Sequence, residues 1–305
     1  MNISLTVIGL DRIGLSVGLA LSKKGAELQR TGVDLDHNKE EAAKNYQVFN
    51  LVTGKLDDAV KLADLIVIDL PLDEVKDMFT RFAQWIKKDA VLLYFSGLPE
   101  KVFGWAKQLL PENVYFIALT PTINPKYIED LDQLTPHADL FDNSQIFISH
   151  LPNIPPKVIQ IATDLTSLIG AIPCFADLTE VDGLQTVVQY LPRITAAALM
   201  DEVINEPGWR DASKLAGDDL AIATRLLNSI LVENQGQLMI ENEQNSLRVI
   251  ANLQNSLAKL AQFIQAGDSQ KLQEYLESLQ MERESWLGKR RNTQPREKKQ
   301  IFGRK

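Results

Sequence analysis

Residues that cross-link chains or bind metals are scarce in this sequence, which has one cysteine and three histidines among 305 residues. The single cysteine, Cys174, excludes a disulfide within the chain. The sequence also shows no signal peptide and no apolar run long enough to span a membrane, so we expect a protein of the reducing cytoplasm with no membrane partner. Because Cys174 lies in the strand-like segment 171–176, we expect a small buried core residue there and not a nucleophile.

Basic residues are also fewer than acidic residues. Lysine and arginine number 32 against 40 acidic residues, a formal charge of -8, which argues against nucleic acid or an anionic membrane surface as the partner of the folded body. The exception is the end of the chain from Lys289 onward, which is basic, polar and without apolar periodicity. Residues 288–305 are therefore predicted to be a disordered basic tail, which is either simply solvated or binds an anionic surface such as nucleic acid.

A glycine turn follows the first apolar run, residues 3–8, and leads into a helix of small residues. This order is typical of the βαβ unit that binds dinucleotides through the fingerprint G-x-G-x-x-G. Gly9 and Gly14 hold the first and third positions, whereas the second is Asp11. Its Cβ and negative charge lie where the backbone should approach a pyrophosphate, and the neighbouring Arg12 offsets only part of that charge. The turn predicts the fold and a weakened cofactor site.

The segment 31–36 is predicted to end a second strand, where this fold places an acid for the ribose hydroxyls. Asp34 stands at the right distance for that role. Alternatively, Asp34 and Asp36 only cap the helix that starts near residue 38. The sequence leaves both interpretations open.

Continuous apolar runs at 65–70, 91–96 and 114–119 are typical of strands buried on both faces of a parallel sheet, and amphipathic segments separate them. This alternation predicts an α/β fold, a Rossmann-like doubly wound parallel sheet, over residues 1–150. Ligands of such sheets bind at the carboxyl ends of the strands. Besides the turn and Asp34, those ends carry Pro71, Ser96 and Thr120.

Three prolines within 151–156 mark the predicted boundary of this domain, because they interrupt a helix or a central strand. Residues 157–287 then show the helical spacing of leucine, isoleucine, valine and alanine and predict an all-α domain. Segment 241–265 is long for a helix that packs only inside its own domain. It predicts either the seam of a homodimer or an internal bundle helix.

Three segments carry a resemblance to a known family. The segment GWRDASKLAGDD at 208–219 is similar to G-F-[RK]-D-x-T-R-I-A-x-x-D, QYLPR at 189–193 is similar to S-H-L-P-H, and ADLF at 138–141 is similar to A-D-L-F. In this order they resemble the prephenate and arogenate dehydrogenases of tyrosine biosynthesis, from residue 3 to about residue 287.

That resemblance implies a nucleotide-binding domain followed by a helical, dimer-forming domain. It also implies oxidation of a ring hydroxyl by hydride transfer to NAD or NADP, with loss of the ring carboxylate as carbon dioxide. The cofactor contacts would come from Gly9, Asp11, Arg12, Ile13, Gly14, Asp34 and Pro71.

The implied catalytic positions are altered in part. Ser96 falls on the family's active-site serine. Thr120 stands where the family has the histidine that polarises or deprotonates the ring hydroxyl, and threonine has no proton affinity near neutrality.

The implied substrate positions are also mixed. Arg210 and Lys214 fall on two substrate-binding cations, and their i, i+4 spacing on a helix suits an organic dianion. Alternatively, they form surface ion pairs with neighbouring acids. Tyr190 and Arg193 replace two histidines of the helical motif, which changes any polar contact made there.

Three functions therefore stay open: an active dehydrogenase, a catalytically silent relative that keeps the dimeric fold and an organic-anion cleft, and an enzyme re-purposed for another substrate. With Asp11 and Thr120 both departing from the pattern, the sequence predicts weak nicotinamide binding and little turnover of prephenate.

Overall fold

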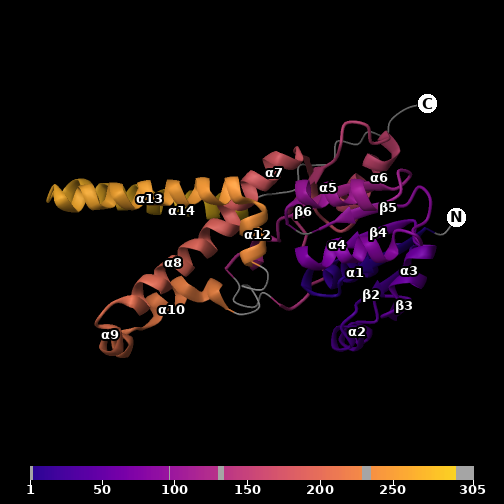
Figure 1. The fold of residues 1–305 in the computed structure, drawn as a ribbon, viewed down its shortest axis with the longest axis horizontal. Helices are drawn as coiled ribbons and strands as arrows, with labels where there is room; N and C mark the ends of the chain where they lie inside the picture. The colour runs from indigo at the N-terminus through magenta and orange to yellow at the C-terminus, as the bar shows by residue number, and fades with distance from the viewer. Residues whose placement is uncertain (1–2, 96, 130–133, 229–234, 293–305) are drawn as a thin grey trace.

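The computed structural model describes residues 3–95, 97–129, 134–228 and 235–292 (Figure 1). Its centre is an eight-stranded sheet in the order β3-β2-β1-β4-β5-β6-β7-β8. All neighbouring strands are parallel except β6 and β7. The strands are β1 (Ser4–Ile8), β2 (Gln29–Val33), β3 (Leu51–Thr53), β4 (Leu65–Ile68), β5 (Val91–Tyr94), β6 (Tyr115–Pro121), β7 (Gln145–Ser149) and β8 (Ile172–Phe175).

Helices cover both faces of this sheet, which confirms the predicted doubly wound architecture. Every residue of β4 and of β5 is buried, because the crossover helices pack on both sides of them. One core lies under α1 and α6, and the other lies under α3, α4 and α5. The helices are α1 (Arg12–Lys23), α2 (His37–Lys44), α3 (Leu56–Leu62), α4 (Leu72–Phe82), α5 (Pro99–Leu109) and α6 (Pro156–Leu168).

The strand order reverses at β1, which has β2 on one side and β4 on the other. Connections leave the two strands in opposite directions at such a switch point and open a crevice at their carboxyl ends. The glycine turn after β1 and the residues after β4 therefore meet there.

The sheet domain extends past the boundary predicted from the prolines. β8 pairs with β7 in parallel, so α6 and β8 belong to the sheet domain, and the helical region begins at α7 (Leu178–Gln185). The physical reason is that proline is tolerated in the first turn of a helix, and Pro156 is the first residue of α6.

The helical region consists of two projections (Figure 1). One continues from α7 through a π-helical turn, η2 (Thr186–Tyr190), into α8, α9 and α10; the other is the antiparallel pair α13 and α14. These helices are α8 (Leu191–Asn205), α9 (Trp209–Leu215), α10 (Asp218–Thr224), η3 (Arg225–Leu227), α12 (Gln235–Glu241), α13 (Glu243–Gln265) and α14 (Ser269–Arg291).

The long helix α13 keeps its apolar face largely exposed. Leu257 is 57% exposed and Ile264 is 67% exposed, and of the residues in α13 only Ser246 and Val249 are buried. In the described part of a single chain, this face therefore lacks the cover that an internal bundle helix would have.

Three further expectations differ from the structure or lie outside it. Cys174 is half-buried and not a core residue, because β8 is an edge strand. The basic segment at Lys289–Arg291 is helical, since α14 continues through it; the rest of the predicted disordered tail, 293–305, lies outside the described residues. No helix within the described ranges is both long and apolar enough to cross a membrane.

Candidate functional site

The turn between β1 and α1 requires glycine at two positions. Gly9 has φ +92°, and a Cβ on it would lie 1.9 Å from the backbone oxygen of Asp69. A Cβ on Gly14 would lie 1.9 Å from the carbonyl oxygen of Gly9. These are the first and third glycines of the fingerprint, and they pack helix on strand as that motif demands.

Asp11 stands at the N-cap position of α1, but its side chain makes no capping hydrogen bond. Its carboxylate points across the mouth of the turn to Lys39 of α2, with Oδ2 and Nζ 2.8 Å apart. The side chain of Asp11 is 52% exposed, so the pair gains little stability in water. The carboxylate of Asp11 therefore stays at the start of α1, beside the glycine turn.

A second carboxylate occupies the start of α1 directly. The backbone N–H of Gly14 donates to Oδ2 of Asp69, which follows β4 at the switch point, at 3.0 Å. Burial raises the pKa of Asp69 to about 7; the Gly14 N–H opposes this, and the nearby carboxylates of Asp11 and Asp34 add to it. The N–H groups at a helix start are the ones that bind phosphate in this fold. The chain therefore supplies its own carboxylate at the anion position.

Sequence reasoning missed Asp69, although a signal was available. An acid that directly follows a fully buried apolar strand must reach the carboxyl end of the sheet, where the fingerprint turn lies.

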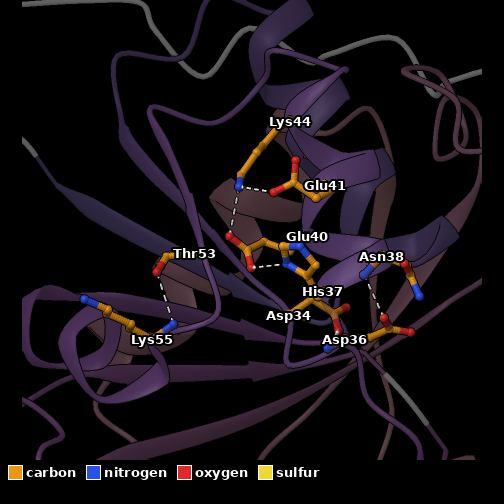
Figure 2. A network of polar contacts seen from close by, with 9 residues as sticks. All are labelled: Asp34, Asp36, His37, Asn38, Glu40, Glu41, Lys44, Thr53 and Lys55. Carbon is orange, nitrogen blue, oxygen red and sulfur yellow. Dashed lines mark hydrogen bonds and ion pairs between the residues drawn. The ribbon is translucent and has the colours of Figure 1, made fainter.

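Two acids, Asp34 and Asp36, follow β2, and the sequence left open whether they cap α2 or contact a ribose (Figure 2). Asp36 caps α2, because its Oδ1 accepts the N–H of Asn38 at 2.8 Å. Asp34 is 8% exposed and holds the turn to β2: its Oδ2 accepts the N–H of Leu10 and its Oδ1 accepts the N–H of Asp36, each at 2.9 Å. Both oxygens of Asp34 are thus engaged by backbone, and a ribose contact from it stays a prediction.

Glu40 adds a further carboxylate beside this end of the site (Figure 2). It lies between His37, at 3.6 Å, and Lys44, at 3.0 Å. The hydrogen bond from Lys44 holds the pKa of Glu40 below its ordinary value. This end of the site is acidic, and Lys44 is already paired with Glu40 and Glu41.

Of the two predicted catalytic residues, the structure describes Thr120 and not Ser96. Thr120 lies on β6, is 6% exposed, and its Oγ1 has no hydrogen-bond partner within the described chain. Pro71 is the N-cap residue of α4, and Ser96 lies outside the described residues. None of the three histidines is assigned as the missing base: His137 stacks on Tyr127 at 4.3 Å between ring centroids, His37 lies on α2, and His150 follows β7 with its Nδ1 2.7 Å from the backbone oxygen of Leu151.

Tyr190 approaches the carboxyl end of the sheet. Tyr190 is 1% exposed, and a Cβ on Gly97 would lie 2.7 Å from its hydroxyl. Burial raises the pKa of Tyr190 to about 12, so its hydroxyl stays protonated at neutral pH. Arg193 donates from Nη1 to Gln235 at 2.9 Å, and burial lowers the pKa of its guanidinium. The structure thus places Tyr190 in the core between the sheet and the helical region; contact of either residue with a substrate stays a prediction.

Arg210 and Lys214 lie elsewhere in the chain. Both are exposed on α9, which forms the tip of one helical projection, far from the sheet (Figure 1). Lys214 pairs with Asp211 at 2.8 Å. One chain therefore does not bring these cations to Thr120, and their role in binding a dianion stays a prediction.

Comparison with known families supports one assignment for both parts of the chain. Residues 17–172 match the family model "Prephenate dehydrogenase, nucleotide-binding domain", and residues 179–278 match "Prephenate dehydrogenase, dimerization domain".

Two curated proteins are distant relatives. The prephenate dehydrogenase of Bacillus subtilis (strain 168) is 21% identical over 254 residues, 78% of this chain and 66% of that protein, just under two thirds of its length. The cyclohexadienyl dehydrogenase of Zymomonas mobilis is 21% identical over 292 residues, 92% of this chain and 94% of that protein.

Solved structures share the fold. Prephenate dehydrogenase from A. aeolicus, in complex with hydroxyphenyl propionate and NAD+, has a TM-score of 0.79 at 18% identity and covers 94% of this chain and 99% of its own. Synechocystis arogenate dehydrogenase has a TM-score of 0.73 at 17% identity and covers 93% of this chain and 100% of its own. At these identities, the likeness shows the fold alone.

Proposed function

This chain belongs to the prephenate dehydrogenase family, and from that premise we propose that it is a catalytically silent homologue, which keeps the two-domain dimeric scaffold without NAD(P)-dependent oxidation of prephenate or arogenate. The observation that carries the proposal is the hydrogen bond from Gly14 to the carboxylate of Asp69. It occupies one of the backbone donors at the start of α1, where this fold binds a dinucleotide pyrophosphate, and it does so with an acidic group of the chain itself.

The residues around the turn do not fit a dinucleotide pyrophosphate. Asp11, Asp34 and Asp69 bring three acidic groups to one turn, and Lys39 forms an ion pair with Asp11 there. Each uncompensated carboxylate near a phosphate weakens the binding free energy of the phosphate by on the order of 1 kcal/mol or more, depending on solvent screening. Protonation of Asp69 would remove its charge but would leave the phosphate to compete for an N–H that is already bonded.

The residue at the position of the catalytic base removes a second requirement for activity, which is independent of cofactor binding. A general base contributes about 10²–10⁴ in rate, and Thr120 cannot act as one. Tyr190 cannot replace it, because with a pKa of about 12 it holds its proton at neutral pH. Weak cofactor binding and slow chemistry together support a silent enzyme.

The dimer is part of the same proposal. The match to a dimerization domain and the exposed apolar face of α13 support a homodimer formed through the helical region. Arg210 and Lys214 remain candidates for binding an organic dianion on the surface of that scaffold.

Calorimetric titration of NAD+ and of NADP+ into the full chain tests the proposal. We expect no saturable binding to the native chain, and binding to the double variant Asp11→Gly/Asp69→Ala, which frees the Gly14 N–H. Asp73→Asn, an exposed acid in the first turn of α4, is the matched control and should behave like the native chain. Tight cofactor binding together with brisk prephenate oxidation by the native chain would refute the proposal.

A further inference from the structure

A polar cavity lies where the sheet domain meets the helical region. Its volume is about 560 Å³. Glu100, Lys101 and Trp105 of α5 line one side, and Asp182 of α7 and Glu241 of α12 line the other. Junctions between domains are common places for small-molecule sites.

The wall of this cavity carries an excess of negative charge. Its three carboxylates, on Glu100, Asp182 and Glu241, face one basic side chain, Lys101. Lys101 is already paired with Glu241, with Nζ and Oε2 2.5 Å apart. Glu100 accepts a hydrogen bond from the Thr179 hydroxyl at 3.0 Å. Asp182 is therefore left without a cationic partner within the described chain.

Asp182 is the most deeply placed of these acids. It is 6% exposed, and its Oδ1 has no hydrogen-bond partner among the described residues, although the carboxylate receives the backbone N–H of Glu100. Burial, and then the charge of Glu100, raises the pKa of Asp182 to about 7. A buried carboxylate oxygen without a partner is costly, and a bound cation would remove that cost.

We propose that this cavity binds an organic ammonium ion, which pairs with the carboxylate of Asp182 and packs its apolar part against the ring of Trp105. The ring already has a cation near it, because Nζ of Lys101 lies 5.9 Å from its centroid. A bare metal ion fits the site less well, since no group of three metal-binding side chains is found in the part of the chain that the structure describes. The proposal is independent of whether the chain binds NAD.

The probe for the test is benzylammonium, with benzyl alcohol as its neutral counterpart, titrated calorimetrically into the full chain. We expect saturable binding of the ammonium and none of the alcohol. Asp182→Asn should weaken binding at least about tenfold, as expected for a lost charged hydrogen bond. Trp105→Leu should weaken it several-fold, and Glu112→Gln, an exposed acid beyond α5, should leave it unchanged.

The pH dependence provides a second readout. The titratable groups near Asp182 are Glu100 and Lys101 of α5 and Glu241 of α12, which line the same cavity, and Tyr190 further along its own helical segment. Because Asp182 must lose its proton to hold the cation, affinity should rise about tenfold between about pH 6 and pH 8. Circular dichroism should show Asp182→Asn folded. Equal binding of the alcohol, unchanged binding by folded Asp182→Asn, or no saturable binding of the ammonium would overturn the proposal.

Discussion

The carboxylate of Asp69 lies 3.0 Å from the backbone nitrogen of Gly14, so the residue that follows β4 and the first turn of α1 are joined by a hydrogen bond across the switch point of the sheet. Phosphate groups normally use such an N–H. This contact makes the anion position of the fold part of the protein's own structure, and it is the basis of the first prediction.

Restoring the active-site groups should restore activity in two steps. Asp11→Gly/Asp69→Ala should bind NAD+ yet oxidise prephenate slowly, because Thr120 is still no base. Adding Thr120→His should raise the rate by about 10²–10⁴, the usual contribution of a general base. The measurement is the absorbance of the reduced cofactor, with Thr122→His, just past the end of the same strand, as control. Equal rates in the double and triple variants would contradict the assignment of Thr120.

The glycine turn should tolerate no side chain at its first position. Gly9→Ala puts a Cβ against the Asp69 backbone at a positive φ, and we expect a loss of about 2–4 kcal/mol in the free energy of unfolding. Gly104→Ala is the control, because a Cβ at that position would have nothing within 4 Å and α5 is helical there. It should raise stability by up to about 1 kcal/mol. Urea denaturation measures both, and similar losses in the two variants would argue against a specific backbone requirement.

Asp182 should make stability depend on pH. Its pKa in the folded chain, about 7, lies above its value in the unfolded chain, so the folded state binds the proton more tightly. The unfolding free energy therefore falls as pH rises from about 4 to above 7. Asp182→Asn removes this loss and should be more stable than the native chain by up to about 4 kcal/mol near pH 8, with a smaller difference near pH 5. Urea denaturation of both proteins at the two pH values measures this difference in unfolding free energy. A difference that is the same at both pH values would contradict the prediction.

The exposed face of α13 should hold two chains together. We expect the native protein to sediment as a dimer and Leu257→Asp/Ile264→Asp to sediment as a monomer, because two charges would be buried in the seam. Leu62→Asp is the control, since Leu62 is 72% exposed on α3 in the sheet domain. A monomeric native protein, or a dimer that survives the double substitution, would exclude this seam.

Much of the sheet domain could be predicted because its determinants are local. The buried runs of β4, β5 and β6 are continuous and apolar, and Gly9 and Gly14 stand at a spacing that serves one turn geometry. The same local reasoning failed at residues 151–156. Prolines that interrupt a strand also start a helix, and only the pairing of β8 with β7 shows that the chain returns to the sheet.

The site follows the same division. Residue types and their spacing were enough to predict the dinucleotide fold, because Gly9 and Gly14 belong to one local motif. The weakened cofactor turn at Asp11, and the missing base at Thr120 that the family resemblance implies, stay predictions. The contact of Asp69 with Gly14 joins residues 55 positions apart, and the cavity at Asp182 needs α5, α7 and α12 to meet. Such contacts, and the burial that raises the pKa of both acids, arise only from packing between segments that are distant in the sequence.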